Sequence, residues 1–284
     1  MKNKAKLSVV LFVVVLIIAA LVLFFFGDFL FPDKKGVKEY DQTPTLEEVP
    51  FKPAEADRKE PSEKLAVVRK PLKTQKSEYE RINEEVVIFF DYLDHQDYVK
   101  SYKIKEGTYE HSKKLIAELA ANPPVVSGET KDLFSILRNM SHFYRILDRR
   151  NVSLIKSVLR NEREIEEPLM DLLFQWIILE MENSHSDIDI SLASLYEYAG
   201  FFLDTLAGKA YLMRRDSKTR ILITYYSIIV VDMANKKKLN RHGIDILPHV
   251  DLALDDMSRY GGLEYREKYL SKLKEIKRGL RKRI

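Results

Sequence analysis

The sequence predicts an all-α protein that a single N-terminal helix anchors in a membrane, and three observations support this class. Residues 7–26 form a run of twenty positions whose only polar member is Ser8. Residues 27–74 hold six of the ten prolines. After Thr74, apolar residues recur with the helical spacing of three and four. We therefore expect a basic N-terminal flank (1–6), a transmembrane anchor (7–26), a disordered Pro-rich linker (27–74) and a helical domain (75–284).

The apolar run has the length of a membrane-spanning helix. Twenty residues at about 1.5 Å each extend about 30 Å, the thickness of the hydrocarbon core of a bilayer. A cleaved signal peptide fits less well, because bulky Phe24, Phe25 and Phe26 end the run where a peptidase needs small residues. The lysines of the 1–6 flank favour a cytoplasmic N-terminus. We expect a single pass through the inner (cytoplasmic) membrane, with the helical domain outside, in the periplasm or extracellular space.

The prolines of the linker prevent regular helix, and its thin apolar content cannot offset the entropy of ordering. A flexible chain of this length reaches about 40 Å. The composition therefore favours a spacer between the bilayer and the helical domain over a docking strip.

Several helices of the domain are predicted from their apolar spacing. One carries Ile82, Val86, Phe89, Phe90 and Leu93, and a shorter one covers roughly 109–121, ahead of Asn122-Pro123-Pro124. Pro168 is placed in the first turn of another helix.

Two longer apolar stripes are each interpreted as one helix. The first runs through Leu133, Leu137, Met140, Tyr144 and Leu147, with Ser153 as a candidate cap for the helix that follows. The second runs from Leu192 to Met213 and includes Leu206. Its small residues Gly200, Ala207 and Gly208 would allow a neighbouring helix to approach closely.

Residues 221–231 are apolar on every side and rich in β-branched side chains, which by propensity alone favours a strand. A candidate N-cap at Asp216 or Ser217 and a lysine run at 236–238 instead favour a buried helix. Pro248 is expected to begin a further helix that ends near Gly261-Gly262, and 263–284 to form a basic amphipathic one. We expect an irregular bundle of seven to nine helices, with a short α-solenoid as the alternative.

The sequence contains no cysteine and no phosphate-loop, nucleophile-elbow, zinc-protease or dinucleotide-binding motif, so no catalytic residue, metal ligand or cofactor is assigned. Segment 263–284 has nine cationic side chains against three glutamates. Its cations are candidates for contact with an anionic surface: Lys268, Lys272, Lys274, Lys277, Arg278, Arg281, Lys282 and Arg283. A weaker candidate for a metal or acid–base site is a cluster of ligand-type residues: His242, Asp245, His249, Asp251, Asp255 and Asp256.

These features favour a non-enzymatic, membrane-tethered interaction or scaffold module. Its partners would be the lipid bilayer, through residues 7–26, and a protein, an anionic lipid or an acidic polymer. Two alternatives remain. The first is a small-ligand or metal-dependent enzyme domain with a helical pocket. The second is a membrane-linked nucleic-acid binder that uses the basic C-terminal helix, and its electrostatics would be those of phosphate-backbone contacts.

Overall fold

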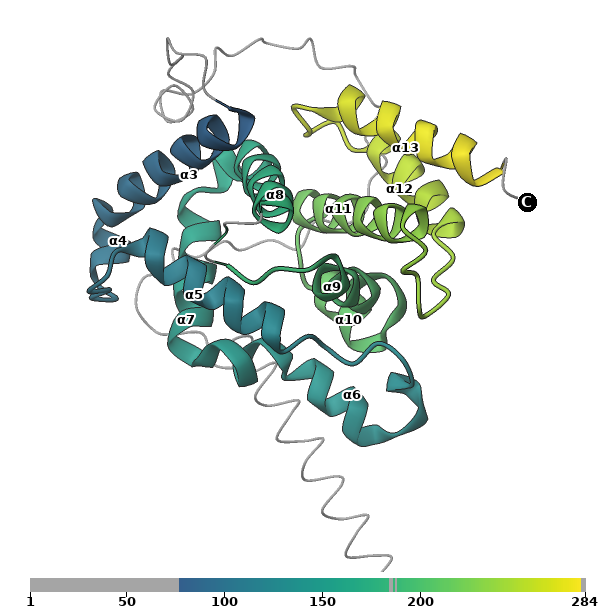
Figure 1. Ribbon diagram of the computed structural model, residues 1–284, viewed down its shortest axis with the longest axis horizontal. Helices are drawn as coiled ribbons and strands as arrows, with labels where there is room; N and C mark the ends of the chain where they lie inside the picture. The colour runs from purple at the N-terminus through teal and green to yellow at the C-terminus, as the bar shows by residue number, and fades with distance from the viewer. Residues whose placement is uncertain (1–76, 184–185, 187, 282–284) are drawn as a thin grey trace, which may run out of the picture. The chain divides into compact units, whose positions relative to one another are not determined.

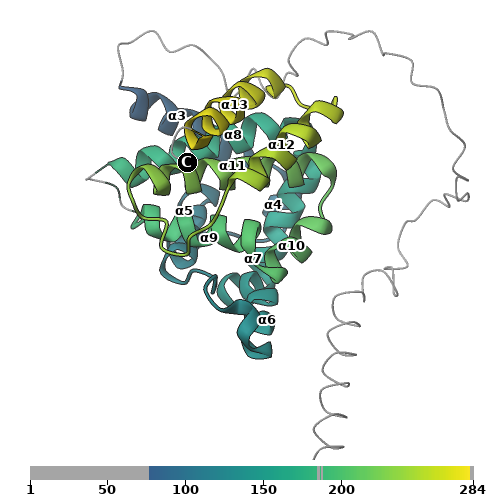
Figure 2. The same cartoon turned by 90° about the vertical axis from the view of Figure 1, so that its right-hand side faces the viewer.

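The computed structural model describes residues 77–183, 186 and 188–281, and the predicted anchor and linker lie outside these residues. The described chain is all-helical (Figures 1 and 2) and holds eleven α-helices and two short 3-10 helices. The α-helices are α3 (Glu78–Asp94), α4 (Asp97–Lys100), α5 (Thr108–Ala121), α6 (Leu133–Met140), α7 (His142–Asn161), α8 (Glu166–Glu182), α9 (Leu192–Asp204), α10 (Leu206–Met213), α11 (Ser217–Lys236), α12 (Leu247–Arg259) and α13 (Arg266–Arg281). The 3-10 helices are η1 (Glu129–Lys131) and η2 (Arg163–Ile165).

The central element is α11, the segment for which strand propensity and helix signals disagreed. The side chain of Asp216 accepts a hydrogen bond from the Thr219 amide and so caps the helix. Helices α8, α9 and α12 all contact α11, and its side chains are buried around much of its circumference. Burial on several sides explains the apolar, β-branched composition, because tertiary packing outweighs the weak propensity term.

Two main apolar cores organise the described helices. The larger lies among α9, α11, α12 and α13 and includes Leu222, Ile228 and Leu273. The second joins α3 to α8. There the five predicted α3 residues are all buried, and the fully buried Trp176 donates its indole N–H to Asn83 at 3.1 Å. Pro168 lies in the first turn of α8, as predicted.

Both long apolar stripes are broken, which corrects the prediction of two continuous helices and explains why the helices number more than nine. The first splits between α6 and α7, and Leu133 is more than half exposed. Helix α7 is itself kinked at Asp148, whose φ is 59°, and the Asp148 carboxylate accepts from the Asn151 amide. Asp148 therefore has the capping role predicted for Ser153, which lies within α7 and donates to the Arg149 carbonyl.

The second stripe splits at Thr205, between α9 and α10. The Thr205 hydroxyl accepts from the Gly208 amide and donates to the Phe201 carbonyl, which ends one helix and begins the next. A Cβ on Gly208 would lie 1.8 Å from the Phe201 carbonyl oxygen, so this tight turn requires glycine. The break turns Leu206 and Met213 outward, where the stripe had predicted core residues.

Buried glutamates connect helices that are distant in sequence. The carboxylate of Glu167 accepts from the backbone amides of Glu264 and Tyr265 just before α13. Glu129 accepts from the amides of Leu206 and Ala207 at the start of α10. A carboxylate at a helix N-terminus satisfies amides that have no partner within the helix and interacts favourably with the helix dipole.

Within the described residues, no helix combines the length and apolarity needed to cross a bilayer.

Candidate functional site

The predicted basic helix is present as α13, and most of its described cations have partners. Lys268 contacts both oxygens of Asp171, at 2.9 and 2.7 Å. Ion pairs also join Lys272 to Glu275 (3.0 Å) and Lys277 to Asp251 (2.6 Å). The apolar side of α13 is buried in the larger core. The structure therefore places this helix as a packed element, with three of its seven described cations in ion pairs.

A shallow hollow of about 510 Å³ remains toward the end of α13, between Lys274, Lys277, Arg278 and Arg281. Its four lining residues come from one helix, so they form a cationic strip and do not surround a ligand. Lys282 and Arg283 lie outside the described residues.

The acidic and histidine cluster is distributed among separate local interactions. His242 contacts the buried carboxylate of Glu197 at 2.7 Å, and Asp245 accepts from the Leu247 amide before α12. Asp255 pairs with Arg259 one turn later in α12, whereas Asp251 pairs across to α13. Burial lowers the pKa of His249, and Asp256 accepts, through its backbone carbonyl, the hydrogen bond that ends the helix. No three His, Asp or Glu side chains of the described chain converge in a way that could hold a metal ion.

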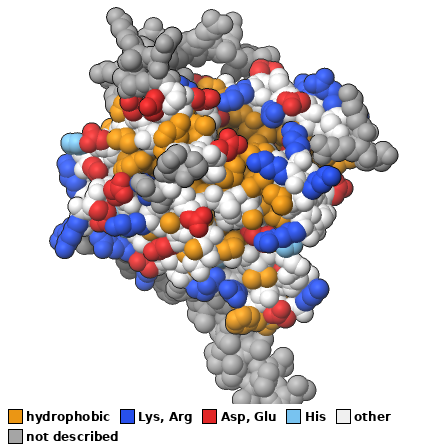
Figure 3. All heavy atoms as spheres, viewed as in Figure 1, with side chains coloured by type: hydrophobic (Ala, Val, Ile, Leu, Met, Phe, Trp, Pro, Cys, Tyr) orange, Lys and Arg blue, Asp and Glu red, His pale blue; other side chains and the backbone are white. Residues whose placement is uncertain are grey.

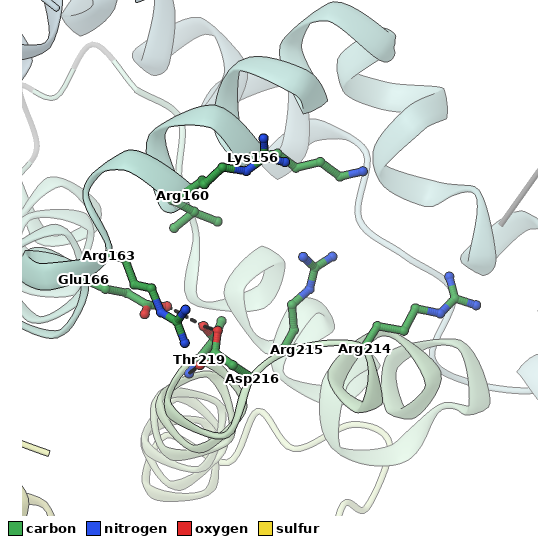
Figure 4. A pocket seen from close by; sticks show the side chains of 9 residues that line it. Lys156, Arg160, Arg163, Glu166, Arg214, Arg215, Asp216 and Thr219 are labelled. Atoms are coloured by element: carbon green, nitrogen blue, oxygen red, sulfur yellow. Dashed lines mark hydrogen bonds between the residues drawn. The ribbon is translucent and has the colours of Figure 1, made fainter. Parts of the chain in front are cut away.

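The structure brings together a second set of basic residues that the sequence does not place side by side. A pocket of about 330 Å³ lies between the end of α7 and η2 on one side and the α10–α11 junction on the other (Figure 4). Its lining residues are Lys156, Leu159, Arg160, Arg163, Glu166, Arg214, Arg215, Asp216 and Thr219. We call it the arginine pocket. Five of the nine lining side chains are cationic.

Three guanidinium groups of this pocket differ from the paired lysines of α13, Lys268, Lys272 and Lys277. Within the described part of the chain, Arg160, Arg163 and Arg215 form no ion pair. The Arg215 guanidinium carbon lies 4.2 Å from the centroid of the Tyr211 ring. This stacking fixes the side chain, which in Figure 4 points into the space between the two walls. The Nε of Arg215 is buried without a hydrogen-bond acceptor in the structure.

The opposite wall is held in a similar way. Lys156 donates to the Tyr144 hydroxyl at 2.9 Å and lies over the ring of the same residue. Arg160 is one turn later on α7, and Arg163 follows in η2. Cations from two walls therefore face one space, an arrangement that fits an anion with several acceptor oxygens, because planar guanidinium groups bind such oxygens in pairs.

Glu166 and Asp216 are the two acidic side chains in this lining, and a shared hydroxyl joins them. Oγ1 of Thr219 lies 2.5 Å from Glu166 Oε1 and 3.0 Å from Asp216 Oδ2. A hydroxyl has one hydrogen to donate. Both contacts are therefore satisfied when Glu166 carries a proton and donates to Thr219, which donates to Asp216.

The direction of the pKa shifts agrees with this proton position. Burial raises the pKa of Glu166, against a smaller opposing effect of the Thr219 hydrogen bond. Burial also disfavours the charged form of Asp216, but hydrogen bonds from the Thr219 amide and hydroxyl outweigh it and lower its pKa. When Glu166 is protonated, Asp216 is the one charged acid of the lining against five cations.

Sequence reasoning missed the arginine pocket because its two halves are about fifty residues apart. Each half has a linear signal: Lys156, Arg160 and Arg163 recur at spacings of four and three residues, and Arg214 and Arg215 are adjacent. No family model, no curated protein and no solved structure matches this chain.

Proposed function

We propose that this protein is a membrane-tethered helical interaction module, an irregular multi-helix bundle that binds an anionic ligand in the arginine pocket. The observation that carries the proposal is the convergence of cations from two separate walls, three of them without an ionic partner in the described chain. The guanidinium group of Arg215, which the Tyr211 ring holds in place without an ion pair in the described chain, is prepared to bind an anion.

The chemistry of the pocket favours a phosphate-type group over a single carboxylate. Its cations outnumber its acids by five to two, and it is large enough for more than one tetrahedral group. The anchor at 7–26 and the linker at 27–74, as the sequence predicts them, would hold this pocket near a bilayer on the outer side of the inner membrane.

Calorimetric titration of the full-length protein with pyrophosphate, in neutral detergent micelles at about 0.15 M ionic strength, tests the proposal. We expect saturable binding to one site. The double variant Arg160→Gln/Arg163→Gln should lower the affinity by about 100-fold, because a charge-assisted hydrogen bond contributes about 1.5 kcal/mol or more.

A matched control removes two cations from α13. Lys274→Gln/Arg278→Gln should leave pyrophosphate affinity within about twofold, because exposed charges on one helix are strongly screened. The proposal fails if the wild type does not bind pyrophosphate, or if both double variants weaken binding equally, as a diffuse charge effect would.

A further inference from the structure

The exposed apolar side chains of the described domain are concentrated on two short helices. Leu133 and Phe134 of α6 are 53% and 72% exposed, and Leu206 and Met213 of α10 are 55% and 79% exposed. These are four of the eight large hydrophobic residues exposed in the described chain, on two of its shortest helices. The two helices contact each other, so the four side chains belong to one region, which we call the α6–α10 edge.

The α6–α10 edge is held rigidly, so its exposure does not result from loose packing. The buried Glu129 accepts from the amides of Leu206 and Ala207 and from the side-chain amide of Asn139. Asn139 in turn forms hydrogen bonds with both backbone groups of Val125. One carboxylate thus fastens the start of α10 to the end of α6.

Cations alternate with the apolar residues along this edge. On α10, Lys209 shares a helical face with Leu206 and Met213, at spacings of three and four residues, and Lys209 is exposed. On α6, the exposed Arg138 follows Phe134 by one turn. Figure 3 shows apolar side chains at the α6 end, with Lys and Arg side chains and acidic side chains beside them.

Two exposed acids, Asp132 and Asp204, also lie near these helices. The Asp132 carboxylate is occupied by the Ser135 amide and hydroxyl at the start of α6. These hydrogen bonds lower the pKa of Asp132, so it keeps its negative charge. The exposed cations Lys131, Arg138 and Lys209 outnumber the two acids by three to two.

We propose that the α6–α10 edge binds the surface of an anionic bilayer and so fixes the orientation of the helical domain on the membrane. Interfacial helices insert apolar side chains between headgroups and place Lys and Arg against lipid phosphates, which is the pattern found here. The proposal rests on the tether of the proposed function, because a linker with a reach of about 40 Å keeps the domain close to the bilayer and raises its effective concentration there.

The absence of native cysteine makes a direct test possible. Single variants Phe134→Cys and Met213→Cys, labelled with an environment-sensitive nitrobenzoxadiazole dye, are reconstituted as full-length protein in phosphatidylglycerol–phosphatidylcholine vesicles. Leu252→Cys on α12 is the matched control, because Leu252 is 57% exposed and belongs to neither helix of the edge. Vesicles that contain nitroxide-labelled lipid then report contact between dye and bilayer.

We expect lipid quenching to be at least about threefold stronger at positions 134 and 213 than at 252. It should decrease in pure phosphatidylcholine and with Lys209→Glu, because about one cation–lipid contact is lost. Equal quenching at all three positions overturns the proposal. A blue-shifted dye without lipid quenching also overturns it, because the edge would then be covered by protein.

Carbonate extraction of the same vesicles examines the anchor separately. Protein released by carbonate contradicts the tether of the proposed function, whereas lipid quenching at 134 and 213 still decides whether the edge contacts lipid. Pyrophosphate binding by Phe134→Ser/Met213→Ser, which adds no charge beside the pocket, should match the wild type, so failure of the edge and failure of the arginine pocket are distinguishable.

Discussion

The arginine pocket and the basic face of α13 carry similar charge but offer it to a ligand in different ways. On α13, three of the described lysines form ion pairs, and the remaining cations lie along one helix. In the pocket, cations from α7, η2 and the α10–α11 junction face a common space, and Arg160, Arg163 and Arg215 have no ionic partner within the described chain.

The difference shows that the number of charges in a segment does not identify a binding site. A cation already paired with a carboxylate must lose that partner before it binds a ligand, so much of its contribution is offset. A cation held by an aromatic ring without a carboxylate retains its full electrostatic interaction with an incoming anion. Within the described residues, Lys274, Arg278 and Arg281 of α13 form no ion pair either, but they lie along one helix. Convergence from two walls therefore distinguishes the pocket from the helix with the higher linear charge density.

Charge reversal gives the largest expected contrast between the two regions. Arg215→Glu should weaken pyrophosphate binding by about 1,000-fold, because it removes a charge-assisted hydrogen bond and places a repelling carboxylate in the pocket. Arg281→Glu on α13 introduces the same charge change at an exposed position and should stay within about twofold. Titration calorimetry of both variants in micelles measures the difference.

The expected difference between the arginine pocket and α13 is contradicted if Arg281→Glu lowers the pyrophosphate affinity as strongly as Arg215→Glu does. That result would mean that pyrophosphate responds to the net charge of the domain and does not bind one particular wall of the pocket.

The protonation of Glu166 should have the next largest effect on the affinity for an anion. This effect is expected for the arginine pocket and not for α13. Burial raises the pKa of this carboxyl, so falling pH neutralises it and should strengthen anion binding. Glu166→Gln mimics the neutral form. It should increase the affinity at about pH 8 by about tenfold and remove most of the pH dependence.

Sulfate is the suitable probe for this measurement, because its charge stays constant between about pH 5 and about pH 8. The exposed neighbour Glu164 provides the control, since Glu164→Gln removes the same charge outside the pocket lining. The raised pKa of Glu166 also affects stability, because the folded state binds the proton more tightly than the unfolded state does. The contribution of this proton to the free energy of unfolding is present at acid pH and is lost as pH rises through the folded pKa. A pH profile unchanged by Glu166→Gln would contradict the assigned proton position.

The sequence predicted the helices best where one face is buried and polar residues mark the ends. All five stripe residues of α3 lie in the core, and Asp216, one of the two candidate caps, is the N-cap of α11. Such elements depend on local spacing and capping, which a linear pattern contains.

The sequence could not predict features created by contacts between distant residues. The break before α10 depends on Thr205 and on Glu129, which lies about seventy-five residues earlier. Apolar spacing continues across the break, so nothing local indicated that Leu206 and Met213 would be exposed. Buried glutamates such as Glu129 and Glu167 resemble surface charges in a sequence, because their function depends on which helix start they meet.

The smallest expected effect concerns the paired cations of α13. Asp171→Asn should lower the free energy of unfolding by about 1 kcal/mol, because the Asp171 carboxylate is mostly buried while the Lys268 ammonium is largely exposed. The Tyr226 hydroxyl also lies 3.3 Å from Asp171, so a double-mutant cycle with Lys268→Met is needed to isolate the ion pair. Thermal unfolding of the four proteins measures this coupling.

The variant Asp171→Asn also tests whether the ion pair of Lys268 prevents α13 from binding anions. Releasing Lys268 should increase pyrophosphate binding at α13 by no more than about twofold, because a single exposed ammonium on a helix still has no second wall opposite it. Binding at α13 comparable to that of the arginine pocket would show that the lack of an ionic partner is sufficient by itself. Weak binding by Asp171→Asn, beside strong binding in the pocket, would show that convergence from two walls is also required.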